Sequence, residues 1–267
     1  MNCIFCGMDG PFNTIEHIIP ESLGNTDDVL NAGFCDKCQR YFGKEIENYV
    51  LNNSPFAFWR VIYGIKNKKG KAPFYNISQS PKGKIPDYHY FSDSGLTIYP
   101  TNFLSEDIVE VEIQNENLLK NVLSGKKKSI NIVLTPKMLI QIGRFLGKMA
   151  LEFYYKEFGE TVYNKEFDAI RNYVRYGTTN EIWPILYGSL NESLHYYQSD
   201  NNQATESRTI YRYGLFYIKT INAHMFLFDI GKERFGIIFD MKFPPPDIVD
   251  TLIDIENNKV QFMWYPL

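Results

Sequence analysis

The stretch that decides the fold is CIFCGMDGPFNTIEHIIPESLGNTDDVLNAGFCDKCQ, residues 3–39. It holds all four cysteines of the 267-residue chain, as two Cys-x-x-Cys pairs separated by residues 7–34: Cys3, Cys6, Cys35 and Cys38. Two such pairs in one short segment are typical of a tetrahedral zinc site with four thiolate ligands. Four thiolates leave no open position on the metal, so we expect a structural zinc that stabilises a segment too small to bury its own core.

The alternative for these cysteines is a pair of disulfides in a secreted protein. The N-terminus has no basic start followed by an apolar run, so we expect no signal peptide. The chain contains no run of 18 uncharged apolar residues, so we expect no membrane span. We therefore expect a cytoplasmic protein, in which thiols stay reduced and zinc is favoured over disulfides. The net charge of −3 argues against a protein that binds nucleic acid over most of its surface, but it is compatible with a local basic groove.

The pattern around the cysteines predicts a strand, a loop, a second strand and a helix. Residues 13–20, NTIEHIIP, form a short apolar run that Pro20 ends, and a polar loop with Gly24 follows. Residues 29–34, VLNAGF, predict the second strand. From residue 35 or 36 the apolar spacing becomes helical and continues to about residue 53.

The remainder of the chain predicts a mixed set of helices and strands. Residues 55–66 and 164–177 predict helices, and residues 135–159 predict a long helix with Pro136 at its first position. The basic segment 66–74 predicts an exposed loop or a linker. The expected strands are 96–100, 107–113, 130–134, 208–221, 224–230, 234–241 and 259–267. We therefore expect an α+β fold, in which a small zinc-bound ββα module at residues 1–53 precedes a mixed α+β body at residues 54–267.

Three segments together resemble the HNH endonucleases, specifically the group in which paired Cys-x-x-Cys motifs bind a structural zinc. They are CIFCG at 3–7, EHIIPESLGN at 16–25 and CDKCQRYFGKEIE at 35–47. The resemblance implies a ββα module that holds one Mg²⁺ or Mn²⁺ over a scissile phosphate and hydrolyses DNA, with double-stranded DNA as the expected substrate. It also implies a role in restriction or phage defence, with target selection by the body. A homodimer is left open.

The resemblance assigns a role to individual residues. His17 would be the general base, since an imidazole that titrates near neutrality suits that task. Glu16 would be a metal ligand, and Gln39 stands where the family places an Asn or His as the other ligand; oxygen donors of this kind suit Mg²⁺. Asn31 is nearest to the family Asn that orients the base, one residue out of register, and Asn25 is a rival for that role. Because adjacent strand residues point to opposite faces, Glu16 and His17 can serve one site only if the strand bends.

Other interpretations of the same residues stay open. His17 could be a structural histidine, and Glu47, two helical turns beyond Gln39, could be a paired or solvated acid instead of a site residue. The Gln39 side chain is one methylene longer than Asn, and a misplacement of about 1 Å can reduce a rate roughly a hundredfold. The second hypothesis is therefore a zinc-containing nucleic-acid-binding protein with a degenerate, inactive nuclease site. A protein-interaction scaffold is a third.

Two lysine clusters are candidates for contact with nucleic-acid phosphates. The first comprises Lys66, Lys68, Lys69 and Lys71, and the second comprises Lys126, Lys127 and Lys128. For the first cluster, phosphate contact and an exposed loop are equally good interpretations. For the second cluster, we favour an exposed loop. The other histidines, His89, His195 and His224, have no companions at useful spacing, and we interpret them as structural.

Overall fold

The computed structural model describes residues 2–25, 27–62, 65, 75–77, 96–105, 108–113, 120, 124–126, 136–177, 183–189, 211–219, 221–231, 233–242 and 260–263. Several expectations lie outside these residues. They are the strand at 130–134, the lysines Lys66, Lys68, Lys69, Lys71, Lys127 and Lys128, and the histidines His89 and His195.

The N-terminal module has the expected order of two strands and a helix. Strand β1 (Glu16–His17) pairs antiparallel with β2 (Val29–Leu30), with Glu16 opposite Leu30 and His17 opposite Val29. Both strands are shorter than predicted, because the chain turns into the 3₁₀ helix η1 (Glu21–Leu23) after the first and into bends after the second. The hairpin therefore consists of two strands of two residues each.

The helix of the module begins at the second cysteine pair. The N-cap is Cys35 in an extended conformation, and its Sγ accepts a hydrogen bond from the backbone N–H of Cys38 at 3.4 Å. The helix runs through α1 (Asp36–Phe42), a π-helical turn η2 (Gly43–Glu47) and α2 (Asn48–Asn53). Ser54 then adopts extended backbone and ends it, close to the predicted position. The buried face of this helix comprises Cys38, Phe42, Ile46, Val50 and Leu51.

Within its described residues, the body combines three helices, two 3₁₀ segments and two antiparallel sheets. The helices are α3 (Pro55–Ile62), α5 (Pro136–Phe158) and α6 (Asp168–Tyr176), with η3 (Gly159–Tyr163) and η4 (Lys165–Phe167) between the last two. A three-stranded sheet has the order β3 (Tyr75–Ile77), β4 (Leu96–Ser105), β5 (Ile108–Ile113). A five-stranded sheet has the order β10 (Val260–Met263), β6 (Ile185–Ser189), β9 (Glu233–Ile238), β8 (Ala223–Ile230), β7 (Tyr211–Ile218).

These elements confirm most of the sequence predictions for the body. Pro136 is the first residue of α5, and Gly177 ends α6 in the left-handed conformation, with φ 44°, that glycine adopts readily. The predicted strands recur as β4, β5, β7, β8, β9 and β10. The sequence analysis did not predict β6, which supplies an inner strand of the larger sheet. The fold is α+β, as expected.

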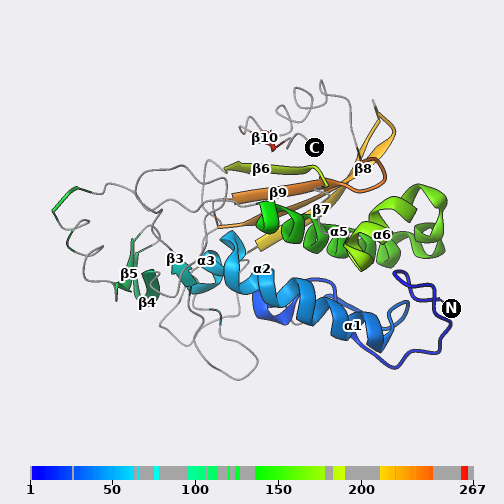
Figure 1. Ribbon diagram of the computed structural model, residues 1–267, viewed down its shortest axis with the longest axis horizontal. Helices are drawn as coiled ribbons and strands as arrows, with labels where there is room; N and C mark the ends of the chain where they lie inside the picture. Colours follow the sequence, from blue (N-terminus) through cyan, green and yellow to red (C-terminus); the bar gives the residue numbers. More distant parts are fainter. Residues whose placement is uncertain are drawn as a thin grey trace.

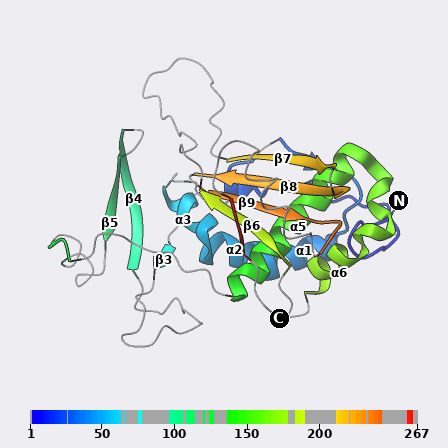
Figure 2. The same ribbon diagram turned by 90° about the horizontal axis from the view of Figure 1, so that it is seen from above.

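Helix α5 is the centre of the molecule. It lies between the five-stranded sheet on one side and the α1–α2 helix on the other, in both views (Figures 1 and 2). Residues 142–152 of α5 are buried without interruption, because neighbours cover the helix on nearly every side. One hydrophobic cluster joins the module to the body through this helix, from Cys3 in the first cysteine pair to Phe239 after β9.

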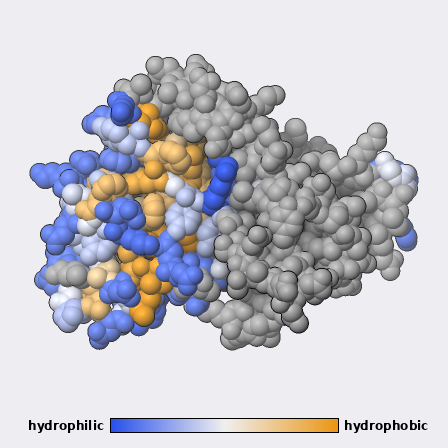
Figure 3. Space-filling model, turned by 180° about the vertical axis from the view of Figure 1, so that it is seen from behind, coloured by the Kyte–Doolittle hydropathy of each residue, from blue (hydrophilic) through white to orange (hydrophobic). Residues whose placement is uncertain are grey.

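A second, smaller hydrophobic cluster lies within the large sheet. It comprises Leu186, Ile218, Ala223, Met225, Leu227 and Ile238. The surface shown in Figure 3 carries a band of hydrophobic residues bordered by hydrophilic ones, over the part of the molecule that holds the described helices and the larger sheet. The exposed large hydrophobic residues of the described chain are Met8, Ile15, Phe158, Tyr176, Phe216 and Tyr217.

Candidate functional site

The two cysteine pairs meet at one point. The Sγ atoms of Cys3, Cys6, Cys35 and Cys38 all lie within 4.8 Å of one another, and the Cys6 and Cys35 sulfurs are 3.6 Å apart. A tetrahedral zinc with Zn–S bonds of about 2.3 Å places its sulfurs roughly 3.8 Å apart. None of the four forms a disulfide. The cysteines therefore fit a structural metal such as zinc, which they could hold between the N-terminal turn and the start of α1.

The surroundings of the cysteines act in opposite directions on the pKa values of Cys3 and Cys38. The hydrogen bond with Cys38 lowers the pKa of Cys3 to about 4, although burial acts against it. The same bond, with burial, raises the pKa of the Cys38 thiol. From α6, Arg175 stacks over the Tyr41 ring with its guanidinium 4.1 Å from the ring centroid. Burial tends to lower the pKa of Arg175, but the charges of Cys38 and Tyr41 raise it above its ordinary value, so a cation is held beside the cysteines.

Asn25 organises the loop between the two strands. Its buried Nδ2 donates to the carbonyl oxygens of Ile19 at 2.7 Å and Asp28 at 3.0 Å. Its Oδ1 accepts from the N–H groups of Asp27 at 3.2 Å and Asp28 at 3.0 Å. One side chain thus satisfies four backbone groups of the loop. By contrast, Asn31 is exposed in the bend after β2.

His17 lies on the partly exposed side of β1. Its Nε2 is 3.5 Å from Oε1 of Glu21, and its side chain is 24% exposed. Its Nδ1 is buried and has no hydrogen-bond partner among the described residues. The nitrogen that an external water or phosphate could approach is therefore Nε2, with a carboxylate beside it to stabilise a protonated ring.

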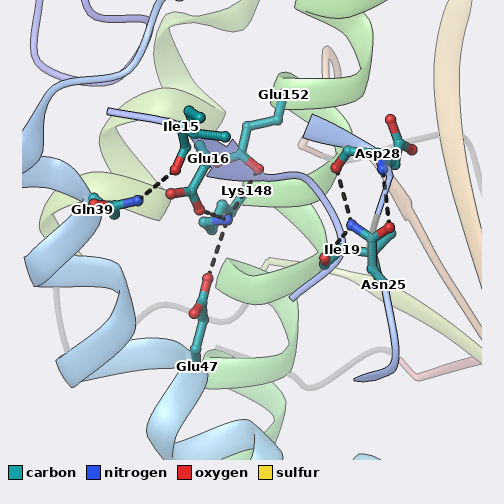
Figure 4. Close-up of polar contacts among 9 residues, drawn as sticks. All are labelled: Ile15, Glu16, Ile19, Asn25, Asp28, Gln39, Glu47, Lys148 and Glu152. Atoms are coloured by element: carbon teal, nitrogen blue, oxygen red, sulfur yellow. Dashed lines mark hydrogen bonds and ion pairs between the residues drawn. The ribbon is translucent and has the colours of Figure 1, made fainter. Parts of the chain in front are cut away.

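Glu16 points in another direction, into the protein. Its side chain is only 7% exposed, and its Oε1 accepts from Nζ of Lys148 at 2.7 Å. Gln39, on α1, donates from Nε2 to the carbonyl oxygen of Ile15 at 2.9 Å. Figure 4 shows the second carboxylate oxygen of Glu16 on the side that faces Gln39. The structure therefore brings Glu16 and Gln39 together and places His17, on the alternate face of the strand, beside Glu21.

Lys148 is the centre of a buried charged cluster that also contains Glu16, Glu47 and Glu152. Its Nζ lies 3.1 Å from Oε1 of Glu47 and 3.0 Å from Oε2 of Glu152 (Figure 4). The side chains of Lys148 and Glu152 are fully buried, whereas that of Glu47 is 20% exposed. Burial raises the pKa of the Glu152 carboxyl despite the neighbouring ammonium. Burial opposes the charge of Lys148, but the three carboxylates raise its pKa well above the ordinary value and keep it protonated.

The π-helical turn explains how Glu47 reaches this cluster. In a regular α-helix, a residue eight positions beyond Gln39 would lie about 80° past two complete turns. The π turn η2 takes up an additional residue and rotates Glu47 back toward the face of Gln39. Both side chains project from the helix toward the same region (Figure 4). Glu47 is a paired acid, which was one of the two interpretations of the sequence.

Two other residues singled out in the sequence have ordinary structural surroundings. The Nδ1 of His224 is 2.7 Å from Oδ2 of Asp240, and its ring packs against Tyr154 and Tyr217. Lys126 is exposed in a turn. Both observations agree with the structural interpretation of the histidine and the exposed-loop interpretation of the lysine.

The sequence analysis missed Lys148 and Glu152. A signal for them was present, because a Lys and a Glu four residues apart occur in the middle of the largely apolar 135–159 helix. Charged residues on the buried face of a helix are expected to be paired with each other or with a neighbour.

Comparison with protein families agrees with the geometry of the module. Residues 3–55 match the family described as HNH endonuclease. No curated protein and no solved structure matches the chain. Among the described helices, none combines the length and apolar character that crossing a membrane requires. The cysteine frame, the short hairpin and the following helix lie inside the matched residues, and this part of the chain is similar to HNH endonuclease domains.

Proposed function

We propose that the protein is a metal-dependent endonuclease that hydrolyses phosphodiester bonds of double-stranded DNA, in restriction or phage defence. The family match supports a nuclease of the HNH type. The substrate and the biological role come from the association of the family and from no individual residue. Reduced cysteines around a zinc suit the cytoplasm as the place of action.

In this proposal, the module divides its residues between stability and chemistry. The four cysteines hold the structural zinc and fix the start of α1, which carries Gln39. Asn25 fixes the loop that follows His17, a role for which its four hydrogen bonds make it a better candidate than Asn31. The body, which begins after residue 53, would select the target, and Lys66, Lys68, Lys69 and Lys71 would contact phosphates.

Glu16 and Gln39 are the residues that would hold the catalytic Mg²⁺ or Mn²⁺. The second carboxylate oxygen of Glu16 and the amide oxygen of Gln39 are hard donors, which is the chemistry that these ions require. When bound, the cation would stabilise negative charge on the phosphate and help to activate water. His17 would take the proton of the attacking water on Nε2, and Glu21, 3.5 Å away, would stabilise the imidazolium that forms.

The observation that carries the proposal is the partly exposed imidazole of His17, beside Glu21 in the hairpin that the cysteines frame. A fixed imidazole with one solvent-accessible nitrogen beside a carboxylate has the properties of a general base.

The test is plasmid nicking with Mg²⁺ or Mn²⁺ by the full chain and by His17→Ala. We expect the variant to lose cleavage while its zinc content and melting temperature stay near those of the parent. Asn13→Ala, an exposed change in the same segment, should cut as the parent does. Cleavage by His17→Ala at the parent rate would contradict the assignment, and loss of fold would favour a structural histidine.

The second hypothesis, a zinc-containing nucleic-acid-binding protein with an inactive nuclease site, is favoured by one observation. The carboxylate of Glu16 already pairs with a buried ammonium. Binding of DNA by the parent, without cleavage under any metal, would support this hypothesis over the nuclease.

A further inference from the structure

We propose that the ammonium of Lys148 is a built-in counter-cation of the candidate site, which competes with the divalent metal for Glu16 and limits the metal affinity of the protein. The inference rests on the proposed function, in which Glu16 is a metal ligand. It assigns a role in the nuclease module to a residue of the body helix α5.

The geometry around Lys148 is that of a cation among oxygen donors. Its Nζ has three N–H groups, and three carboxylates lie within hydrogen-bond distance. They are Glu16 at 2.7 Å, Glu152 at 3.0 Å and Glu47 at 3.1 Å, from β1, α5 and η2 respectively. Carboxylate oxygens that converge on one point from separate elements are also the arrangement that binds a hard divalent cation.

A second observation shows that one ammonium does not satisfy this cluster. The Oε1 atom of Glu152 is buried and has no hydrogen-bond partner within the described part of the chain. The side chain of Glu152 is fully buried, so solvent does not compensate. Three carboxyl groups offer more acceptor oxygens than the three N–H groups of a single ammonium can satisfy. The cluster could therefore accept a cation of higher charge if Lys148 were absent.

Electrostatics gives the direction of the effect. A positive charge 2.7 Å from a Glu16 oxygen repels any second cation that binds the same carboxylate, and burial strengthens the repulsion because the surroundings polarise less than water. In the parent, a metal is left with the other oxygen of Glu16, on the side that faces Gln39 (Figure 4). Removal of the ammonium frees both oxygens and removes the repulsion.

The experiment is a calorimetric titration of the zinc-loaded full chain with Mn²⁺ in divalent-free buffer without chelator. The variants are Lys148→Met, the double variant Lys148→Met with Glu16→Gln, and Lys156→Met as a matched control. Lys156 lies on the same helix and also pairs with an aspartate of the module, Asp28, but it is 40% exposed. We expect Lys148→Met to bind Mn²⁺ at least tenfold more tightly than the parent, Lys156→Met to bind as the parent does, and the double variant to lose the gain.

Unchanged or weaker Mn²⁺ binding by folded Lys148→Met would overturn the inference, as would a gain that persists without the Glu16 carboxylate. If Lys148→Met unfolds without metal, Mn²⁺ should restore its cooperative thermal transition. Lys148→Met combined with Glu152→Gln removes one of the acids and provides a second test, with the same expected gain in Mn²⁺ affinity. Failure of both Lys148→Met and this combined variant to respond to Mn²⁺ would also overturn the inference. Nicking is measured separately: absence of cutting by the parent contradicts the proposed function, whereas the Mn²⁺ titration alone decides the role of Lys148.

Discussion

Replacement of Asn25 by alanine tests how the loop between the two strands is held. The Asn25 side chain is 5% exposed and makes four hydrogen bonds to backbone groups, at 2.7, 3.0, 3.0 and 3.2 Å. Each is expected to contribute about 1 kcal/mol, and truncation removes all four unless water enters, although the carbonyl of Asp28 still accepts from the N–H of Ile18 at 3.1 Å. Allowing for partial entry of water, Asn25→Ala should lower the free energy of unfolding by about 2–4 kcal/mol.

The matched control is Asn31→Ala, the other asparagine in the same part of the module. Asn31 is exposed, so its replacement should change stability by less than about 0.5 kcal/mol. Asn25→Asp keeps the acceptor but replaces the donating Nδ2 by an oxygen that faces the carbonyls of Ile19 and Asp28, so it should destabilise as well. The measurement is urea denaturation followed by far-ultraviolet circular dichroism. Equal stabilities of Asn25→Ala and Asn31→Ala would refute the reasoning.

Three further changes test the metal centre, the candidate ligand and a buried acid. Cys35→Ser should lose zinc and unfold the module, because the free energy of zinc binding stabilises the folded module. The measurement is the zinc content per chain, and Asp36→Asn, a change at the exposed neighbouring residue, should keep its zinc. Gln39→Ala should lower the single-turnover nicking rate tenfold to a thousandfold, about 1.4–4 kcal/mol in the barrier, and Gln39→Asn should keep or raise it; full activity of Gln39→Ala would exclude the ligand role. Burial raises the pKa of Glu233 to about 7 from an ordinary 4.5. As the pH rises from 4.5 to 7, the unfolded chain therefore loses this proton before the folded chain does, and the free energy of unfolding should fall by about 3 kcal/mol. Glu233→Gln should abolish this decline in a pH series of denaturation curves, and an unchanged slope would show that Glu233 is not its source.

The sequence predicts those parts of the molecule in which one local rule determines the outcome. The spacing of the cysteines requires them to share a site, and they do meet. Pro136 marks a helix start because its fixed φ and missing N–H suit the first helical position, and Gly177 marks a helix end because glycine readily adopts the left-handed conformation.

Other parts depend on contacts that local rules do not describe. The π turn that aligns Glu47 with Gln39 has no signature in residues 43–47, and it is stabilised by the pairing of Glu47 with a helix 100 residues further along the chain. The role of Asn25 likewise depends on the path of the loop, since an Asn in a polar segment reads equally well as a simple turn residue. The charges on α5 could be recognised as unusual, but only tertiary packing identifies Glu16 as their partner.

The central position of α5 has a consequence for anyone who would move this nuclease domain into another protein. A fragment cut after residue 53 would carry the cysteines and His17 but would leave behind α5, whose buried residues share one hydrophobic cluster with Phe34, Phe42 and Ile46. It would also bring the Glu16 carboxylate to the surface without its ammonium. A transplant designed to retain the native environment of β1 must therefore include the body helix, so the smallest portable unit is discontinuous in sequence.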